Sequence, residues 1–376
     1  MRLVVSGGGT GGHIYPALAI AAAVRRACPS CEVFYVGTDR GLERELAARE
    51  QVPYYAVHAR GLLGRGLGGK IRGGLAAVRA LGEAWRLLRR LRPQAVVGTG
   101  GYVTGPVGLA AAWLHIPLLL QEQNVYPGWT NRVLARRARL VVIPFPEVRR
   151  YLPPGTPTLV AGNPVRAQRS RSPAEAKAAL GLDPQSRVLL ITGGSQGAAA
   201  INRLARTLAE RWGRYPGWHL YWAYGSRYPA PYPDGQAPAG VHPAPYFYDL
   251  PRLYEAADLF IGRAGAMTVS ECLAFGLAAV LVPSPNVAED HQTRNAALLA
   301  DKGAALLLPE TRLDQPEALT AVEELIADEA RRAAMAERAH ALYRPGSAEA
   351  IAAAVLAAMR GRGGLRDPQA AGAGRS

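Results

Sequence analysis

The chain has 376 residues, of which 49% are hydrophobic and 19% charged; this composition excludes a disordered chain, and the length allows two domains. A net charge of +15 favours an anionic partner, such as nucleic acid, a membrane surface or a phosphorylated substrate, although an arginine-rich solvated surface would give the same value. Three cysteines do not suggest a disulfide scaffold, so we expect a reducing compartment. The pair in Cys28-Pro29-Ser30-Cys31 has redox spacing, but no second Cys or His pair accompanies it, so a redox or zinc site is disfavoured.

The first predicted unit is a strand, a glycine-rich turn and a helix. Residues 2–5 are a short apolar run typical of a buried strand, and residues 16–26 have helical apolar spacing, with a proline suited to the first turn. The turn between them, residues 6–15, brings bare backbone N–H groups close to a ligand, and the helix N-terminus favours negative charge. Thr10 and His13 add side chains that can bind a substrate or transfer protons. A βα turn without a ligand is the alternative.

Strand and helix patterns alternate through the rest of the first half. Strands are predicted at 32–36, 95–98, 117–120, 140–143 and 158–160, and helices at 41–49 and 127–136. This alternation is typical of a parallel sheet with helices on both faces. The most apolar run, 105–120, is too short to span a bilayer, and because the chain begins on a strand we expect no signal peptide.

The second half repeats the opening of the first. After a turn and an arginine-rich stretch at 162–184, a strand at 188–191 leads into the glycine turn 193–197. Two such halves predict an α/β fold of two Rossmann-like domains, with parallel sheets facing each other across a cleft.

We predict these domain boundaries: 1–163, 164–346, a helix at 347–360 that packs back on the first domain, and a disordered tail at 361–376. Residues 224–245, rich in Tyr, Pro and Gly, are expected to form a loop.

A third glycine turn, 98–106, follows the strand at 95–97. Ligands of parallel sheets bind at the carboxyl ends of the strands, so three such turns favour a phosphate-bearing ligand. None fits the P-loop pattern, and the first lacks the dinucleotide spacing and its acidic partner.

Another strand, 258–262, precedes a turn of small residues at 264–266, where backbone N–H groups can meet a phosphate. Glu271 lies about one and a half turns into the following helix, where a carboxylate can accept two hydrogen bonds from a ribose diol. An exposed helical glutamate is the alternative.

Six motifs occur in a fixed order within residues 2–360: Gly8-Gly9-Thr10-Gly11-Gly12-His13, Gly100-Gly101-Tyr102-Val103, Glu122-Gln123-Asn124, Gly162-Asn163-Pro164-Val165-Arg166, Gly193-Gly194-Ser195-Gln196-Gly197 and Gly265-Ala266-Met267-Thr268-Val269-Ser270-Glu271. Together they resemble the MurG family of bacterial glycosyltransferases, in glycosyltransferase family 28. The resemblance implies a GT-B fold and inverting transfer of N-acetylglucosamine (GlcNAc) from UDP-GlcNAc to the C4 hydroxyl of the MurNAc-pentapeptide of lipid I. The product would be lipid II of peptidoglycan synthesis, made by a peripheral enzyme on the cytoplasmic face of the cell membrane.

The resemblance also assigns substrate contacts. The expected donor contacts are Thr10, Gly11, Gly12, Asn124, Arg166, Ser195, Tyr248, Ala266, Met267, Thr268, Val269, Ser270, Glu271 and Gln292. Among them Thr268 and Glu271 map to diphosphate and ribose, Tyr248 presents backbone to uracil, and Gln292 (or His291, if the alignment shifts by one) contacts a sugar hydroxyl. Arg166 would pair with phosphate, with a plain surface arginine as the alternative. The acceptor side is expected at Gly100, Gly101, Tyr102 and Glu122.

The expected chemistry needs one base and a way to meet leaving-group charge. The chain has no D-x-D motif, so we expect no metal site and no cofactor, and backbone amides and helix N-termini must meet the diphosphate charge. His13 is the motif-matched candidate base, although it could instead only contact the ligand, with Glu122 or Tyr102 as fallbacks. The family often has a His before Glu-Gln-Asn; here that residue is Gln121, so no role of that His carries over.

Much of the positive charge falls within residues 61–93, interleaved with aliphatic residues. We predict an anionic membrane surface as the partner of this segment, through Leu67, Ile71, Leu75 and Trp85. An amphipathic helix with a solvated basic face is the alternative.

Two other functions are alternatives for this sequence. One is another UDP-sugar enzyme of the same fold, such as a UDP-GlcNAc 2-epimerase or a lipid glycosyltransferase. The other is a basic nucleic-acid-binding protein, which would spread charge along a groove with stacking aromatics. The basic cluster is interleaved with aliphatics instead, so no nucleic-acid partner is expected.

Overall fold

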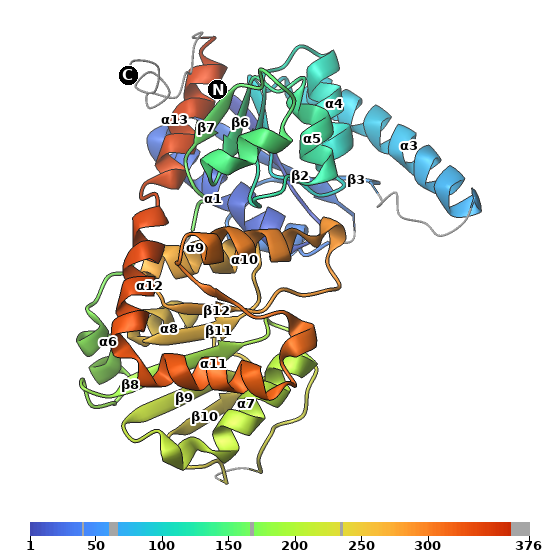
Figure 1. Cartoon of the computed structure of the whole chain (residues 1–376). Coiled ribbons are helices and arrows are strands. Elements are labelled where there is room, and N and C mark those ends of the chain that lie inside the picture. Colours follow the sequence, from blue (N-terminus) through green and yellow to red (C-terminus); the bar gives the residue numbers. More distant parts are fainter. Residues whose placement is uncertain (40, 60–66, 166–168, 234–235, 362–376) are drawn as a thin grey trace. The chain divides into compact units, whose positions relative to one another are not determined.

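The computed structural model describes residues 1–39, 41–59, 67–165, 169–233 and 236–361. They form two compact units, one of Met1–Arg166 with Arg344–Ser376 and one of Ala167–Tyr343 (Figure 1). Arg166 and nearly all of the predicted tail lie outside the described residues.

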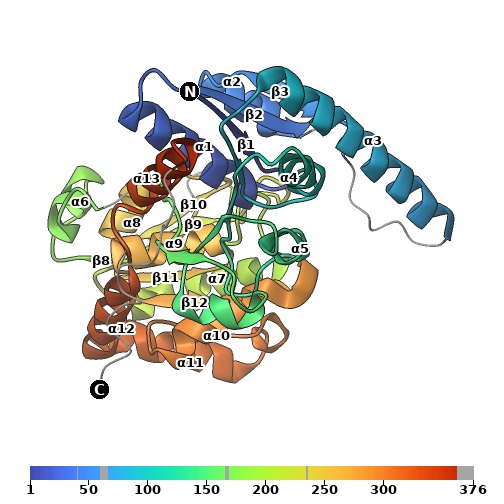
Figure 2. The same cartoon turned by 90° about the horizontal axis from the view of Figure 1, so that it is seen from above.

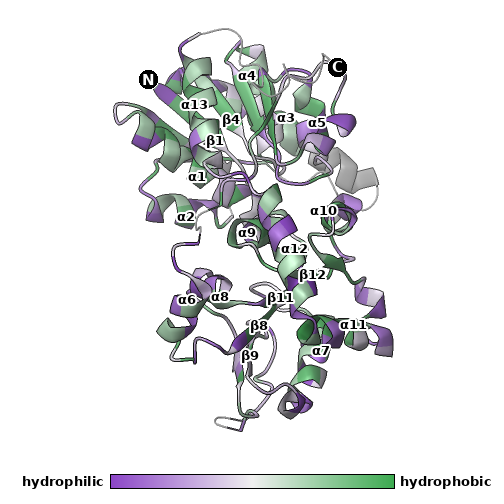
Figure 3. Cartoon of the chain, turned by 60° about the vertical axis from the view of Figure 1, so that its left-hand side comes forward, coloured by the Kyte–Doolittle hydropathy of each residue, from purple (hydrophilic) through white to green (hydrophobic). Residues whose placement is uncertain are grey.

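The first unit is built on seven parallel strands in the order β3-β2-β1-β4-β5-β6-β7. The strands are β1 (Arg2–Ser6), β2 (Glu32–Thr38), β3 (Tyr54–Val57), β4 (Ala95–Gly98), β5 (Leu118–Gln121), β6 (Leu140–Ile143) and β7 (Thr158–Val160). Every residue of β4, β5 and β6 is buried, so helices must cover both faces of the sheet. Strand β4 accordingly takes the hydrophobic colour in Figure 3.

The helices of this unit are α1 (Gly11–Ala27), α2 (Glu43–Arg49), α3 (Leu67–Leu91), α4 (Thr104–Trp113), α5 (Trp129–Ala135) and α13 (Ser347–Met359), with a 3-10 turn at Pro146–Tyr151. Helix α13 packs against α1, so the last of the described helices belongs to the first unit. Helix α3 packs against α4, and its N-terminal end extends away from the rest of the unit in both Figure 1 and Figure 2.

The second unit has six parallel strands in the order β10-β9-β8-β11-β12-β13. The strands are β8 (Arg187–Thr192), β9 (Trp218–Ala223), β10 (Val241–Ala244), β11 (Leu259–Gly262), β12 (Ala279–Leu281) and β13 (Leu306–Leu307). The helices are α6 (Pro173–Ala179), α7 (Ala199–Glu210), α8 (Leu250–Ala256), α9 (Ala266–Phe275), α10 (His291–Asp301), α11 (Pro316–Ala327) and α12 (Glu329–Leu342), with 3-10 turns at Trp212–Arg214, Ala288–Asp290 and Glu310–Arg312. The predicted α/β class with two parallel sheets is confirmed.

Each sheet has one switch point, where the strand order reverses: β1 beside β4 in the first unit, and β8 beside β11 in the second. Ligands of open parallel sheets bind beyond the carboxyl ends of such strands. The turns that leave these four strands are the glycine-rich and small-residue turns singled out in the sequence. The fold therefore gathers two motif turns at the switch point of each unit.

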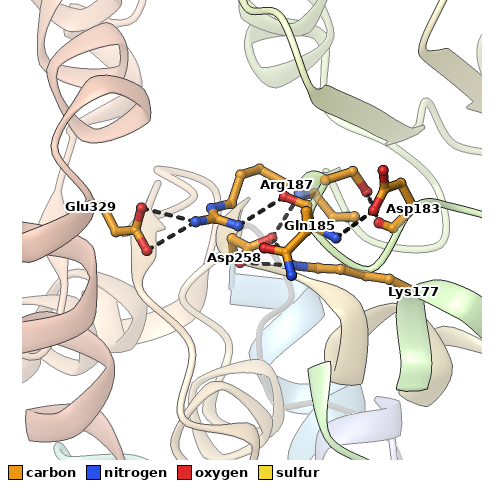
Figure 4. A network of polar contacts seen from close by, with 8 residues as sticks. Lys177, Asp183, Gln185, Arg187, Asp258 and Glu329 are labelled. Carbon is orange, nitrogen blue, oxygen red and sulfur yellow. Dashed lines mark hydrogen bonds and ion pairs between the residues drawn. The ribbon is translucent and has the colours of Figure 1, made fainter. Parts of the chain in front are cut away.

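A polar network closes the opposite, amino-terminal end of β8 and β11 (Figure 4). Lys177 Nζ, almost fully buried, lies 2.8 Å from Asp258 Oδ2, and the same oxygen accepts a 2.8 Å hydrogen bond from Val188 N–H. Arg187 donates to both carboxylate oxygens of Glu329 at 2.9 Å. These pairs fasten α6 and α12 to the sheet at the end away from the switch point.

Two local predictions were wrong. Pro16 does not begin α1 but lies inside it, because the helix already starts at Gly11 in the glycine turn. The predicted loop 224–245 contains β10 at its end, with Pro243 inside the strand. Proline is tolerated there because β10 is an edge strand of its sheet, so the backbone groups on its outer edge need no partner strand.

Candidate functional site

His13 stands in the first turn of α1, beside the turn that follows β4. Its Nδ1 lies 3.0 Å from the backbone oxygen of Thr99 and 3.0 Å from Gln123 Oε1. The Thr99 hydroxyl in turn donates to the backbone oxygen of His13 at 2.7 Å. Thr99 therefore holds both the main chain and the ring of His13. The motif match assigned a role to His13 but none to Thr99 or to Gln123, although Gln123 belongs to one of the six motifs.

The predicted acceptor-side glycines let the turns after β1 and β4 approach each other closely. Gly100 has φ +105°, and a Cβ there would lie 2.8 Å from His13 Nδ1. Gly101 has φ +79°, and a Cβ there would overlap the backbone oxygen of Gly8. Only glycine fits both positions. Tyr102, partly exposed, packs next to Gly9.

Glu122 is buried at the end of β5 and shapes the loop after it. Its Oε1 accepts hydrogen bonds of 2.9 Å from the N–H groups of Gln123 and Asn124. Its Oε2 accepts from Gly128 N–H at 3.0 Å and from Asn131 Nδ2 at 2.8 Å. Both oxygens are thus committed to the protein, which favours a role in placing Asn124 over a role as the base.

Glu43, on α2, is a buried carboxylate that the sequence analysis missed. Its Oε1 accepts the N–H of Gly9 at 3.0 Å, and its Oε2 has no hydrogen-bond partner among the described residues. Burial raises the pKa of Tyr35 and Tyr54, and the charge of Glu43 raises both further. A carboxylate under the first glycine turn occupies one of its N–H groups and repels a second anion. We infer that a diphosphate would not bind at the first glycine turn. The helical pattern of residues 43–49 did not indicate any such role for Glu43.

In the second unit the turn after β8 is interlocked with residues 224–226. Gly197 (φ +80°) and Gly225 (φ +91°) face each other so closely that a Cβ on either would overlap the other segment's backbone. The Ser195 backbone oxygen accepts hydrogen bonds of 3.2 Å from Ser226 N–H and Oγ. The Ser195 side chain itself stays exposed at the carboxyl end of β8.

The turn after β11 ends in the N-terminus of α9, with Gly265 as N-cap and no acidic residue in the first turn. The N–H groups of Ala266, Met267 and Thr268 have no partner within the helix, so they suit an anion. Val269 and Ser270 have buried side chains, and Ser270 Oγ donates to Ala266 O at 2.8 Å. Their side chains therefore face the protein, not a ligand.

Glu271 lies on the same helix and is partly exposed. Burial raises its pKa to about 7, and a 3.2 Å hydrogen bond donated by the Tyr254 hydroxyl acts in the opposite direction. A carboxylate in this place can accept two hydroxyl donors once it is ionised. The predicted ribose contact thus has a suitable group, with an ionisation near neutrality.

Two further predicted contacts, Tyr248 on a loop and Gln292 at the start of a helix, lie around the same end of the second sheet. Tyr248, between β10 and α8, is 94% exposed, and its ring packs edge-on against Tyr246 with centroids 5.2 Å apart. Gln292, in the first turn of α10, accepts Ser284 N–H at 2.9 Å through Oε1. Before it, Glu289 and Asp290 have φ of +57° and +50°, a strained backbone of the kind found at functional sites.

The structure thus divides the predicted residues between the units. At the carboxyl ends of β1, β4 and β5 it gathers Thr10, Gly11, Gly12, His13, Gly100, Gly101, Tyr102, Glu122 and Asn124. At the corresponding end of the second sheet it gathers Ser195, Tyr248, the residues 266–271 and Gln292. Trp85 lies on α3; the side chains of Leu67, Ile71 and Leu75, on the same helix, are outside the described part.

Comparison with known proteins gives family matches in both halves. Residues 3–143 match the glycosyltransferase family 28 N-terminal domain, and residues 188–351 match the glycosyltransferase family 28 C-terminal domain.

Curated relatives are similar over nearly the whole chain. A protein of Symbiobacterium thermophilum is 42% identical over 369 residues, covering 96% of this chain and 97% of the relative. One of Desulforudis audaxviator is 42% identical over 361 residues, covering 93% and 96%. Both carry the name UDP-N-acetylglucosamine–N-acetylmuramyl-(pentapeptide) pyrophosphoryl-undecaprenol N-acetylglucosamine transferase.

Among solved structures, Acinetobacter baumannii MurG matches with a TM-score of 0.76 and 30% identity, covering 94% of this chain and 99% of that one. A Listeria monocytogenes protein described as a UDP-N-acetylglucosamine 2-epimerase matches with a TM-score of 0.68 at 14% identity, covering 97% and 98%, which shows a shared fold alone.

Proposed function

Because the chain belongs to glycosyltransferase family 28, we propose that it transfers GlcNAc from UDP-GlcNAc to the C4 hydroxyl of the MurNAc-pentapeptide of lipid I, with inversion, to give lipid II of peptidoglycan. The observation that carries this proposal is the near-full-length similarity to curated relatives that bear this enzyme name. The switch-point turns of the two units supply groups suited to a nucleotide sugar and to proton transfer.

In this proposal the donor binds to the second unit. The N–H groups at the start of α9 meet the diphosphate, and ionised Glu271 accepts the two ribose hydroxyls. Tyr248, on the loop after β10, and Gln292, in the first turn of α10, are suited to the base and the sugar. When the glycosidic bond breaks, negative charge grows on the diphosphate, so the α9 amides stabilise the transition state more than the ground state.

The acceptor is assigned to the first unit. His13 takes the proton from the attacking C4 hydroxyl, the oxygen bonds to the anomeric carbon, and UDP departs from the opposite face, which gives inversion. The ring is held through Nδ1, so Nε2 is the nitrogen available for that proton. Asn124 also belongs to the first unit, and Glu122 holds its backbone in place. It is a candidate contact for UDP-GlcNAc.

We propose an anionic membrane surface as the partner of the first unit. Among the described residues of α3, Arg86, Arg89 and Arg90 are exposed, and Arg89 lies over the Trp85 ring at 4.6 Å. The last residue of α4, Trp113, is 56% exposed and lines a surface pocket with Arg136 and Arg137. Tryptophan and arginine together suit the interface of an anionic bilayer. None of the described helices is long and apolar enough to cross a membrane.

The test is incubation of the chain with UDP-GlcNAc and a lipid I analogue, followed by analysis of the product linkage. A β-1,4-linked GlcNAc–MurNAc product with release of UDP supports the proposal. Incubation with UDP-GlcNAc alone distinguishes the transferase from a 2-epimerase, because an epimerase would convert the nucleotide sugar without any acceptor. Conversion without acceptor, and no transfer with it, would overturn the assignment.

A further inference from the structure

We propose that Gln123 is a positioning residue: its side-chain amide, oriented by Gln121 and Asn163, fixes the imidazole proton of His13 on Nδ1. Nε2 is then the nitrogen that can accept a proton. The catalytic meaning of this arrangement rests on the proposed function; the arrangement itself rests only on hydrogen bonds within the first unit.

The orientation of these side-chain amides can be deduced from a group whose hydrogen-bonding role is fixed, the backbone oxygen of Gln123. This oxygen can only accept, and Asn163 Nδ2 donates to it at 2.9 Å. Asn163 Oδ1 must therefore face the other way, where it accepts a 2.8 Å hydrogen bond from Gln121 Nε2. Gln121 Nε2 also donates to the backbone oxygen of Glu122 at 3.1 Å, which fixes the same orientation independently.

Because Gln121 Nε2 makes these hydrogen bonds, Gln121 Oε1 faces Gln123 and accepts a hydrogen bond from Gln123 Nε2. Gln123 Nε2 further donates to the backbone oxygens of Thr99, at 2.7 Å, and Gln121, at 3.0 Å. The reversed amide would turn Oε1 of Gln123 toward three acceptors. Gln123 Oε1 therefore faces His13.

His13 Nδ1 then lies between two oxygens that can only accept, Gln123 Oε1 and Thr99 O, each at 3.0 Å. Nδ1 must carry a hydrogen, and a neutral imidazole has only one N–H, so Nε2 bears the lone pair. When Nε2 takes a proton, the Nδ1–H still points at two carbonyl dipoles, which stabilise the cation that forms.

Burial keeps this chain of amides from rearranging. Gln121, Gln123 and Asn163 are at most 4% exposed, so turning any one over would leave buried polar groups without partners. The resemblance assigned no role to Gln121 or Gln123, so it did not imply this hydrogen-bond network.

The first experiment measures the tautomer directly. The full chain is labelled with ¹⁵N-histidine, and the resonances of His13 are assigned by their loss in His13→Asn. At a pH where the ring is neutral, we expect a protonated-type shift for Nδ1 and an unprotonated-type shift for Nε2. The reverse pattern, or an even mixture, would overturn the proposal. This readout needs no transfer activity, so it can succeed or fail separately from the proposed function.

The second experiment compares Gln123→Met, which keeps the approximate shape but removes the amide, with Gln94→Met as a control in the same unit. We expect a mixture of tautomers and at least about a tenfold loss of kcat, with the donor KM nearly unchanged. In a His13→Ala background the same substitution should change kcat little. If kcat falls by the same factor in both backgrounds, Gln123 only stabilises the fold and does not act through His13. If Gln123→Met does not fold, the measurement on the unaltered chain still decides.

Discussion

The hydroxyl of Tyr254 donates a 3.2 Å hydrogen bond to Glu271 Oε2, while burial raises the pKa of that carboxyl to about 7. In the proposed donor site Glu271 accepts the ribose hydroxyls as an ionised carboxylate, so the donor KM should be lowest above this pH. As the pH falls through about 7, the ionised fraction falls, and the donor KM should rise by up to about tenfold per pH unit. Donor KM measured from pH 5.5 to 8.5 checks this.

Tyr254→Phe removes the hydrogen bond that favours the carboxylate, with little change of shape. The pKa of Glu271 should rise, and the increase in donor KM should begin at a higher pH than in the unaltered chain. Glu271→Gln serves as the control, because its donor KM should lose this pH dependence. A Tyr254→Phe profile that coincides with that of the unaltered chain would remove the pair from donor binding.

Glu271→Ala tests the ribose contact itself. Hydrogen bonds to a charged acceptor contribute about 1.5–3 kcal/mol, so the donor KM should rise roughly 10- to 150-fold at pH 8 while kcat is nearly kept. Saturation kinetics separate the two constants. An unchanged KM would take Glu271 out of the site.

The sequence predicted strands β1, β2, β4 to β8 and β11 and the glycine turns, because both depend on residues close together in the chain; it did not predict β3, β9, β10, β12 or β13. The run from Arg2 to Val5 predicts a strand, and the small residues before α9 predict a tight turn. Glu43 and Gln123 could not be found in this way. Glu43 meets Gly9 from 34 positions away, and Gln123 meets His13 from 110, so only the assembled sheet brings them together.

Gly101→Ala should destabilise the first unit. A Cβ there would overlap the backbone of Gly8 and would sit at a positive φ, which together cost at least about 2 kcal/mol. Gly82→Ala, inside α3 and with open space around its Cβ, should instead stabilise by about 0.5–1 kcal/mol. Urea unfolding of both variants measures the difference; equal midpoints would contradict the packing of the two turns.

Membrane binding should depend on the apolar residues of α3. Replacing Leu67, Ile71 and Leu75 with Ser should reduce co-sedimentation with vesicles that contain phosphatidylglycerol, while the donor KM with a water-soluble acceptor stays the same. Leu42→Ser, at an exposed leucine just before α2, is the control and should not change binding. Added salt should weaken binding through the arginines. If the unaltered chain ignores anionic vesicles at low salt, the membrane assignment fails.

In the proposed reaction His13 is the base. Its ring is held by Thr99 and Gln123 through Nδ1, which leaves Nε2 for the acceptor hydroxyl. General-base catalysis contributes about 10²–10⁴-fold, so His13→Ala should lower kcat by that factor while the affinity for UDP stays nearly unchanged. His13→Asn separates proton transfer from simple hydrogen bonding, because an amide can hold a substrate but cannot take its proton. The Asn variant should therefore be about as slow as the Ala variant. If it keeps most of kcat, His13 only positions the acceptor. The base must then be sought at Tyr102, because both oxygens of Glu122 are already committed to the loop that follows β5.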